Sequence, residues 1–241
     1  ANSTSGFGKW ILENVAAEPV YVSTANPKLR TQVAQTTLRN HGYFQGRARY
    51  VEVPEKNAKK SRIAYQILTG PLYHFDEIRY LNFPTEADSL IRKNSHRTNL
   101  HRGAPFSAMQ LSAERERLSN IFRNNGYYYF TPECIAYKAD TVRRKNHVQL
   151  HVQPSESIPA SATRRYHMGR TFITLLKHDK YTVTDTLRFR DVTMAYSGKK
   201  GEPPLRMGVL RRYLFYKEGD LFNHDLQQAG KEKLSELGIL S

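Results

Sequence analysis

The sequence predicts an α+β fold of tandem β-α-α-β-β modules, in which a three-stranded mixed sheet is covered on one face by two helices. Three observations predict this fold. A glycine-aromatic motif ends a helical pattern more than once, the residues after it alternate as strands do, and the helix starts repeat as well. A helix with one apolar stripe needs a sheet or another helix to cover that stripe, which gives a small layered domain.

One repeated motif lies at the helix ends. The segment LRNHGYF at 38–44 matches FRNNGYY at 122–128, and LSELGIL at 234–240 is a weaker third copy. A glycine that follows a helix and precedes apolar residues is typical of a left-handed residue just beyond the helix end. We therefore expect Gly42, Gly126 and Gly238 to be structural glycines.

The helix starts repeat too. A glycine, a phenylalanine three residues later and then a capping residue recur at two places: Gly103, Phe106 and Ser107, and again Gly219, Phe222 and Asn223. Asn26 and Pro27 give the first copy a cap and a helix-starting proline. The sequence predicts helices that begin at or just after each of these caps.

The helix after Ser107 carries an apolar stripe of Leu111, Leu118, Ile121 and Phe122. The charged run at 114–117 is expected to face largely away from the stripe. This helix is therefore predicted to pack on a sheet.

Two segments alternate as half-buried strands do. Ile63, Tyr65 and Ile67 fall on one face of 61–68, while Val148, Leu150 and Val152 fall on one face of 146–153. Each is expected to pair with a strand just upstream, at 47–53 and 133–139. A further strand is predicted at 73–80 and a short helix at 85–93.

These elements predict three modules. Residues 1–70 form a partial module without its first strand, with helices near 7–15 and 26–41. Residues 71–154 form a complete module. Residues 155–241 form a partial module with an insertion near 178–201, in which 186–196 contributes an extra strand pair, and with helices at 205–214 and 223–237. Its final hairpin is expected beyond Ser241, so the chain is interpreted as an excerpt from an array.

Composition limits the function. The chain has 37 Lys and Arg against 22 Asp and Glu, a net charge of +15. This excess favours an anionic partner such as nucleic acid, lipid head groups or an acidic polypeptide. Apolar residues never run to the ~18 that a membrane-spanning helix needs. The single cysteine, Cys134, excludes an internal disulfide and zinc sites built on several cysteines.

Catalytic and metal sites find little support. His147 and His151 lie two pleats apart on the polar face of a strand, without a third ligand nearby. Asp76 and Glu77 are adjacent and point to opposite faces. Cys134 has no histidine placed beside it and is expected to be a buried or half-buried structural thiol. We predict no catalytic residues, no metal and no cofactor.

The repeated unit resembles a known family. The segments LRNHGYFQGRARYVEV, GPLYHFDEIRYLNFP, RGAPFSAMQLSAERERLSNIFRNNGYYYF and LRRYLFYKEGDLFNHDLQQAGKEKLSELGIL are similar to POTRA domains in the periplasmic part of Omp85-superfamily outer-membrane assembly proteins. Within this superfamily, the segments are most similar to BamA/TamA-like "surface antigen" proteins of Bacteroides-type bacteria. The likeness covers nearly the whole chain and is strongest in the middle module.

The resemblance implies a non-enzymatic module at the periplasmic face of the bacterial outer membrane. It implies binding of unfolded outer-membrane client polypeptides and accessory assembly proteins by β-augmentation, beside a C-terminal β-barrel of the parent chain that is absent here. The implied client edges are the first strands of the hairpins: Arg47, Arg49 and Val51, and Glu133, Ile135 and Tyr137. Weak contact with anionic lipid is compatible with the basic turns.

Two other functions are weighed against this one. Nucleic-acid binding has the charge and the aromatic cluster at 127–130 in its favour, but no RNP, KH, helix-turn-helix or zinc-finger spacing is present. The basic runs fall mainly at turns, so nucleic acid is not expected as a partner. A purely structural spacer array is the other alternative.

Overall fold

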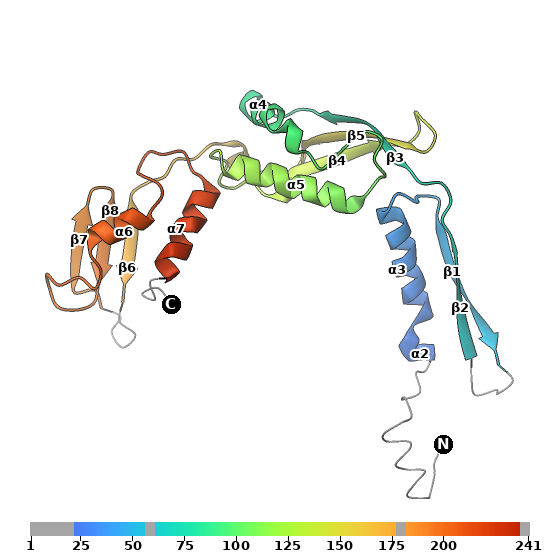
Figure 1. The fold of residues 1–241 in the computed structure, drawn as a ribbon, viewed down its shortest axis with the longest axis horizontal. Coiled ribbons are helices and arrows are strands. Elements are labelled where there is room, and N and C mark those ends of the chain that lie inside the picture. Colours follow the sequence, from blue (N-terminus) through green and yellow to red (C-terminus); the bar gives the residue numbers. More distant parts are fainter. Residues whose placement is uncertain (1–21, 56–60, 177–181, 237–241) are drawn as a thin grey trace, which may run out of the picture. The chain divides into compact units, whose positions relative to one another are not determined.

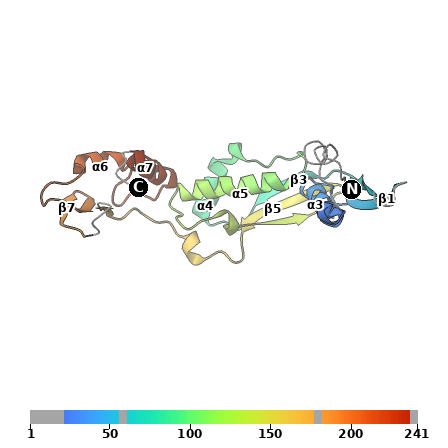
Figure 2. The same ribbon diagram turned by 90° about the horizontal axis from the view of Figure 1, so that it is seen from below.

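A computed structural model describes residues 22–55, 61–176 and 182–236. The chain divides into two compact units. Unit 1 comprises Ala1–His74 with Pro105–Ala108, and unit 2 comprises Phe75–Ala104 with Met109–Ser241. Figure 1 shows the elements of each, and Figure 2 shows them from below.

Unit 1 contains a helical segment followed by a β-hairpin. The helices are α2 (Val22–Ala25) and α3 (Pro27–Asn40), and the strands are β1 (Arg47–Pro54) and β2 (Ser61–Leu68). The side chain of Asn26 accepts a hydrogen bond from the N–H of Leu29 at 3.1 Å, so the predicted cap is confirmed. Beyond the end of α3, Gly42 has φ +84°, as the helix-end motif predicts.

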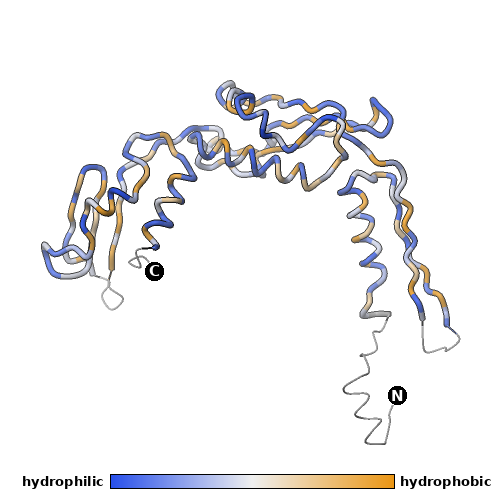
Figure 3. Tube along the Cα trace, in the orientation of Figure 1, coloured by the Kyte–Doolittle hydropathy of each residue, from blue (hydrophilic) through white to orange (hydrophobic). Residues whose placement is uncertain are grey.

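The hairpin of unit 1 is antiparallel, with Ala48 opposite Ile67 and Tyr50 opposite Tyr65. These four side chains share the face on which α3 lies against β1. Tyr65 and Ile67 are 43% and 53% exposed, so α3 leaves part of this face uncovered. Figure 3 shows hydrophobic residues along both strands.

Unit 2 begins with a complete β-α-α-β-β module. Its strands are β3 (His74–Tyr80, of which His74 belongs to unit 1), β4 (Ile135–Asp140) and β5 (His147–Pro154), in the order β3-β5-β4. Its helices are α4 (Thr85–Lys93) and α5 (Ala108–Arg123), with short 3₁₀ turns η1 (Ser95–Arg97), η2 (Pro132–Cys134) and η3 (Ala160–Thr163). Beyond α5, Gly126 has φ +99°, which confirms the second predicted helix end.

The core of this module lies between α5 and the sheet, as predicted. Leu118, Phe122, Val148 and Leu150 are fully buried, and Ile135 nearly so. Along β5 buried and partly exposed residues alternate, because one face of the sheet carries the helices and the other faces solvent. Ile121 of the predicted apolar stripe and Tyr137 of β4 are only half-buried.

The second module of unit 2 has the same strand order with a different chain path. The strands are β6 (Thr171–Leu175), β7 (Asp185–Phe189) and β8 (Val192–Tyr196), ordered β6-β8-β7, with β6 parallel and β7 antiparallel to β8. The helices α6 (Met207–Tyr213) and α7 (His224–Glu236) follow. Buried side chains of the sheet, α6 and α7 form one core: Leu175, Val192, Met194, Tyr196, Leu210, Leu214 and Leu234.

The strand pair predicted within 178–201 is confirmed as β7 and β8, and both strands join the sheet that contains β6. Two other predictions need correction. Glu133 lies in η2 and not on the edge strand, since Pro132 and Cys134 form a 3₁₀ turn before β4 begins. Glu114 is fully buried, although the charged run was expected to face away from the stripe.

Some predictions fall outside the described residues. These are the helix near 7–15 and the third helix-end glycine, Gly238. The final hairpin expected beyond Ser241 stays a prediction.

Candidate functional site

β4 is an edge strand of its sheet in unit 2, and none of the described strands pairs with its outer side. Ser155 donates its N–H to the carbonyl of Cys134 at 2.8 Å, which places this pair in the hydrogen-bonded register with β5. Successive strand residues direct their backbone groups to opposite edges, so Ile135, Tyr137 and Ala139 direct theirs away from β5. Among the described residues, no partner engages the outward groups of Tyr137 and Ala139 or the carbonyl of Ile135, whereas the N–H of Ile135 donates to the carbonyl of Pro132.

A helix face lies beside this open edge. The hydroxyl of Tyr137 donates to the carbonyl of Leu111 on α5 at 2.7 Å. The guanidinium carbon of Arg115, one turn further along α5, lies 4.9 Å from the centre of the Tyr137 ring. A strand added to β4 would therefore extend the sheet and place alternate side chains against α5.

Arg115 keeps unused hydrogen-bonding capacity at this edge. Its Nε is buried without a hydrogen-bond partner, and none of the residues that the structure describes forms an ion pair with it. Arg117, two residues on, instead pairs with the buried Glu114. Glu133 is the acidic group near Arg115: hydrogen bonds from the Thr131 side chain and its own backbone, together with the Arg115 charge, lower the pKa of Glu133.

The outer edge of β1 in unit 1 is partly occupied. The amide of Gln35, on α3, donates to the carbonyl of Gly46 and accepts from the N–H of Ala48 at 2.9 Å. These are the two bonds that a residue of an added strand would make. Gln35 therefore occupies the start of this edge, whereas in the described part of the chain no side chain caps the outward groups of β4, where the N–H of Ile135 alone is engaged, by the carbonyl of Pro132.

The predicted residues of β1 direct their backbone groups inward. The backbone N–H of Ala48 points to the outer edge of β1. Arg47, Arg49 and Val51 therefore direct their backbone hydrogen bonds to β2, and the next outward backbone groups are those of Tyr50 and Glu52. The side chain of Arg49 also donates to that of Gln66 on β2 at 2.7 Å. The strand was thus correctly predicted, but the residues with free backbone groups are the alternate ones.

A buried carboxylate anchors α5 behind the β4 edge. Glu114 accepts hydrogen bonds from the Tyr80 hydroxyl at 2.5 Å, the Asn99 N–H at 2.9 Å and the guanidinium of Arg117. Burial alone would raise the pKa of Glu114, but these hydrogen bonds and the Arg117 charge outweigh it and lower that pKa. Burial and the Glu114 charge raise the pKa of Tyr80 above its ordinary range.

The hydrogen-bond network around Glu114 was not predicted from the sequence, although the sequence contains one indication of it. Glu114 stands three residues after Leu111 and four before Leu118, so it falls on the apolar stripe of α5. A charged residue in such a stripe indicates a buried, paired group. Arg115 carried no comparable signal, because its position depends on where β4 lies.

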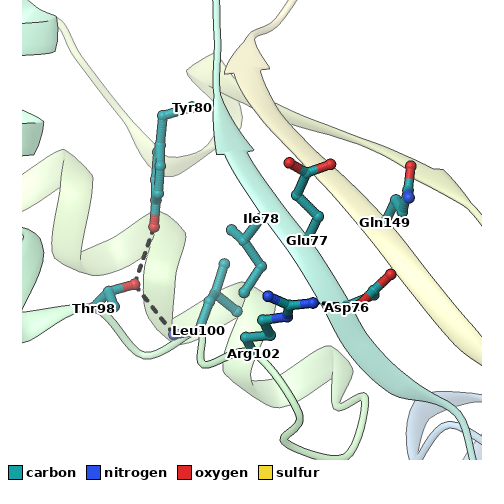
Figure 4. A pocket seen from close by; sticks show the side chains of 8 residues that line it. All are labelled: Asp76, Glu77, Ile78, Tyr80, Thr98, Leu100, Arg102 and Gln149. Carbon is teal, nitrogen blue, oxygen red and sulfur yellow. Dashed lines mark hydrogen bonds and ion pairs between the residues drawn. The ribbon is translucent and has the colours of Figure 1, made fainter.

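A hollow of about 600 Å³ lies beside β3. Figure 4 shows Arg102 reaching Asp76, and Tyr80 joined through Thr98 to the backbone of Leu100. Asp76 also pairs with Arg144, at 2.9 Å. The charged groups in view are thus largely engaged with one another, and no nucleophile lies beside a base there.

A set of contacts between a helix-end glycine and three aromatic residues occurs twice, and we call it a glycine-aromatic clasp. In unit 2, Tyr166 donates its N–H to the carbonyl of Gly126 at 2.8 Å and accepts from the N–H of Phe222 at 2.9 Å, while the Tyr128 ring lies 4.8 Å from that of Phe222. We call Gly126, Tyr128, Tyr166 and Phe222 the second clasp.

The same contacts occur in unit 1. Tyr73 donates to Gly42 at 3.0 Å and accepts from Phe106 at 2.9 Å, and the Phe44 ring lies 4.8 Å from that of Phe106. These four residues form the first clasp. The repeated helix-end and helix-start motifs of the sequence therefore meet each other in space.

The aromatic run at 127–130 is largely engaged in packing. Tyr127 and Phe130 are buried against Phe122, at ring distances of 5.5 and 4.6 Å. Tyr129 is half exposed but meets the Tyr166 ring edge-on at 5.3 Å. Such edge-to-face contacts do not form the stacking platform that bases require.

Within residues 22–55, 61–176 and 182–236, no group of three or more potential metal ligands comes together. Cys134 is buried, as predicted. Over the same ranges, none of the helices has the length and apolar character needed to span a bilayer.

Comparison with known proteins finds likeness in structure alone. No protein-family model and no curated protein matches the chain. A crystal structure of BamA POTRA3-5 from Haemophilus influenzae is 14% identical with a TM-score of 0.45, covering 93% of this chain and 73% of that one. The N-terminal domain of Omp85 from Thermosynechococcus elongatus is 15% identical with a TM-score of 0.29, covering 98% and 82%.

A third solved structure is POTRA1-3 of the periplasmic domain of Omp85 from Anabaena, at 13% identity and a TM-score of 0.27, covering 99% of this chain and 80% of that one. Identities and TM-scores this low carry no functional argument. The functional argument therefore rests on the geometry of the sheet edges.

Proposed function

We propose that this chain is a polypeptide-binding module that captures extended segments by β-augmentation at the outer edge of β4. Its place would be the periplasmic part of an outer-membrane protein assembly or translocation factor, as the sequence resemblance to POTRA domains implies. Unfolded outer-membrane clients and accessory assembly proteins are the partners that this proposal entails.

The open edge of β4 is the observation that carries the proposal. The outward N–H and carbonyl groups of Tyr137 and Ala139, together with the carbonyl of Ile135, offer hydrogen bonds that do not depend on the partner's sequence. An open edge is a hazard for a soluble protein unless it is short, charged or used. β4 spans only six residues and carries Lys138, which limits self-association while leaving room for one added strand.

The contrast with β1 supports the same proposal. Gln35 satisfies the first outward groups of β1, and no side chain within 22–55, 61–176 and 182–236 does so for β4. The two hairpins are repeats of one unit, so the difference lies in a few side chains and not in the fold. We therefore assign the stronger binding edge to β4.

A proline on the edge tests the proposal. Proline at Ala139 removes an outward N–H without touching the bonds to β5, so Ala139→Pro should fold and lose binding of an extended eight-residue probe peptide. The matched control is Ala136→Pro, which removes an N–H that bonds to Gln153 and should destabilise the module instead.

N-methylated probes give a second readout. Methylating the peptide N–H groups that face β4 should abolish binding, whereas methylating the alternate ones should leave it unchanged, as measured by NMR titration of the amides of 135–139. Equal effects of both methylation patterns, or unchanged affinity in a folded Ala139→Pro variant, would contradict edge pairing.

A structural spacer array is the second candidate, and the two clasps favour it. Each joins a helix end to the start of another helix through the same backbone hydrogen bonds. This role is compatible with edge binding, because the clasps and the β4 edge use different residues. A chain that acts as a spacer alone would bind none of the probe peptides.

A further inference from the structure

We propose that Arg115 reads a carboxylate on the polypeptide strand that pairs with β4, so that the edge selects acidic segments. The inference rests on the proposed edge binding and specifies the ligand. It predicts that an acidic side chain of the bound strand, on the face that packs against α5, contacts the guanidinium of Arg115.

The state of Arg115 is the first step. Its Nε is buried without a partner, and in the described part of the chain its guanidinium forms no ion pair. A buried N–H without a partner costs free energy, and a cation is stabilised when a carboxylate satisfies it. Arg115 therefore has hydrogen-bonding capacity that a ligand can use.

The position of Arg115 is the second step. It lies over the ring of Tyr137, whose backbone groups are outward on the open edge. In a paired strand, the residue opposite Tyr137 would have its side chain about 5 Å from the tyrosine side chain and on the same face of the sheet. That side chain would lie beside the guanidinium.

The surrounding charge is the third step. Glu114 is engaged by Arg117, Tyr80 and Asn99 and turned into the core. The exposed Glu133 forms no ion pair with Arg115 among the described residues, although the charge of Arg115 helps to lower the pKa of Glu133. A carboxylate from the ligand would thus be the group that directly neutralises Arg115.

Two eight-residue peptides test the inference. They carry the same alternating apolar and polar sequence and differ only in glutamate or glutamine at the position that faces α5. The wild-type protein should bind the glutamate peptide about three- to fivefold more tightly, the range expected for a half-exposed ion pair. Raising the salt concentration should reduce this preference.

Variants of Arg115 assign the preference. Arg115→Gln should bind the two peptides equally, and Arg115→Lys should keep part of the preference because it keeps the charge. Arg92→Gln, which removes an exposed arginine of α4 paired with Asp88, should behave as the wild type does. Unchanged amide spectra of β5 would show that each variant is folded.

The outcomes separate the two proposals. Equal affinity of the wild type for both peptides, or a preference that survives in Arg115→Gln, overturns carboxylate recognition and leaves edge binding intact. Failure of both peptides to bind the wild type overturns edge binding and this inference with it.

Discussion

Gly126 lies against Leu221 without room for a side chain between them: a Cβ at Gly126 would be 2.7 Å from Cδ1 of Leu221. The backbone of Gly126 also has φ +99°, a region that residues with a Cβ rarely adopt. The close approach allows Tyr166 to donate to the Gly126 carbonyl, so the second clasp requires glycine for both conformation and space.

Replacing this glycine is predicted to weaken unit 2. Gly126→Ala should lower the free energy of unfolding by about 1–3 kcal/mol, measured by urea denaturation, through backbone strain and the clash with Leu221. Gly169→Ala is the matched control, since a Cβ at Gly169 has open space and its φ is not positive. Equal stability of the two variants would remove the structural role assigned to Gly126.

The buried carboxylate predicts an acid-sensitive stability. The pKa of Glu114 is lowered in the folded chain, so its contribution to stability is complete above the ordinary value of 4.5 and is lost as the pH falls through the lowered pKa. Glu114→Gln should destabilise by about 3 kcal/mol at neutral pH, because Arg117 would be left without its partner.

Urea denaturation across pH 2–7 checks this. Glu114→Gln should lose part of the acid-dependent decline in stability that the wild type shows. Asp88→Asn breaks the exposed pair with Arg92 and should change neutral-pH stability by less than about 0.5 kcal/mol. A parallel decline in wild type and Glu114→Gln would exclude Glu114 as a source of the acid sensitivity.

A reciprocal pair joins the end of α5 to the start of α7. Asn124 donates its amide to the carboxylate of Asp225 at 2.6 Å and accepts from the N–H of Asp225 at 3.0 Å. Asn124→Asp should cost about 1–2 kcal/mol, since two carboxylates would then face each other and one donor would be lost.

Exchanging the two groups should restore the contact. In the double variant Asn124→Asp/Asp225→Asn, an amide again donates to a carboxylate, and the negative charge stays near the N-terminus of α7. A double-mutant cycle of unfolding free energies should therefore show favourable coupling of about 1 kcal/mol. Additive effects would show that the pair contributes nothing to joining the two helices.

Much of the fold followed from local patterns. The helix at 85–93 was predicted at its observed bounds, and Gly42 and Gly126 end their helices in the left-handed conformation. Alternation placed β2 and β5, because a half-buried strand repeats every two residues whatever its neighbours are. The hairpin within 178–201 was predicted only as an addition, since its place in the sheet depends on long-range pairing with β6.

The candidate site was predicted in part. Ile135 and Tyr137 were placed on an edge strand, and the structure directs their backbone groups outward. For β1 the alternate residues carry the outward groups, because a one-residue difference in register exchanges the two edges. Nothing local in the sequence distinguishes these two cases.

The sequence by itself determined the repeated module, its helix ends and the alternation of its strands, because these depend on residues within one or two turns of each other. Only the tertiary structure decided which edge is open, that Gln35 caps β1, and that Arg115 lies over Tyr137 without an acidic partner. Each of these depends on side chains of a helix meeting a strand that follows it by more than ten residues. Such contacts are set by packing across the layers and not by local propensity.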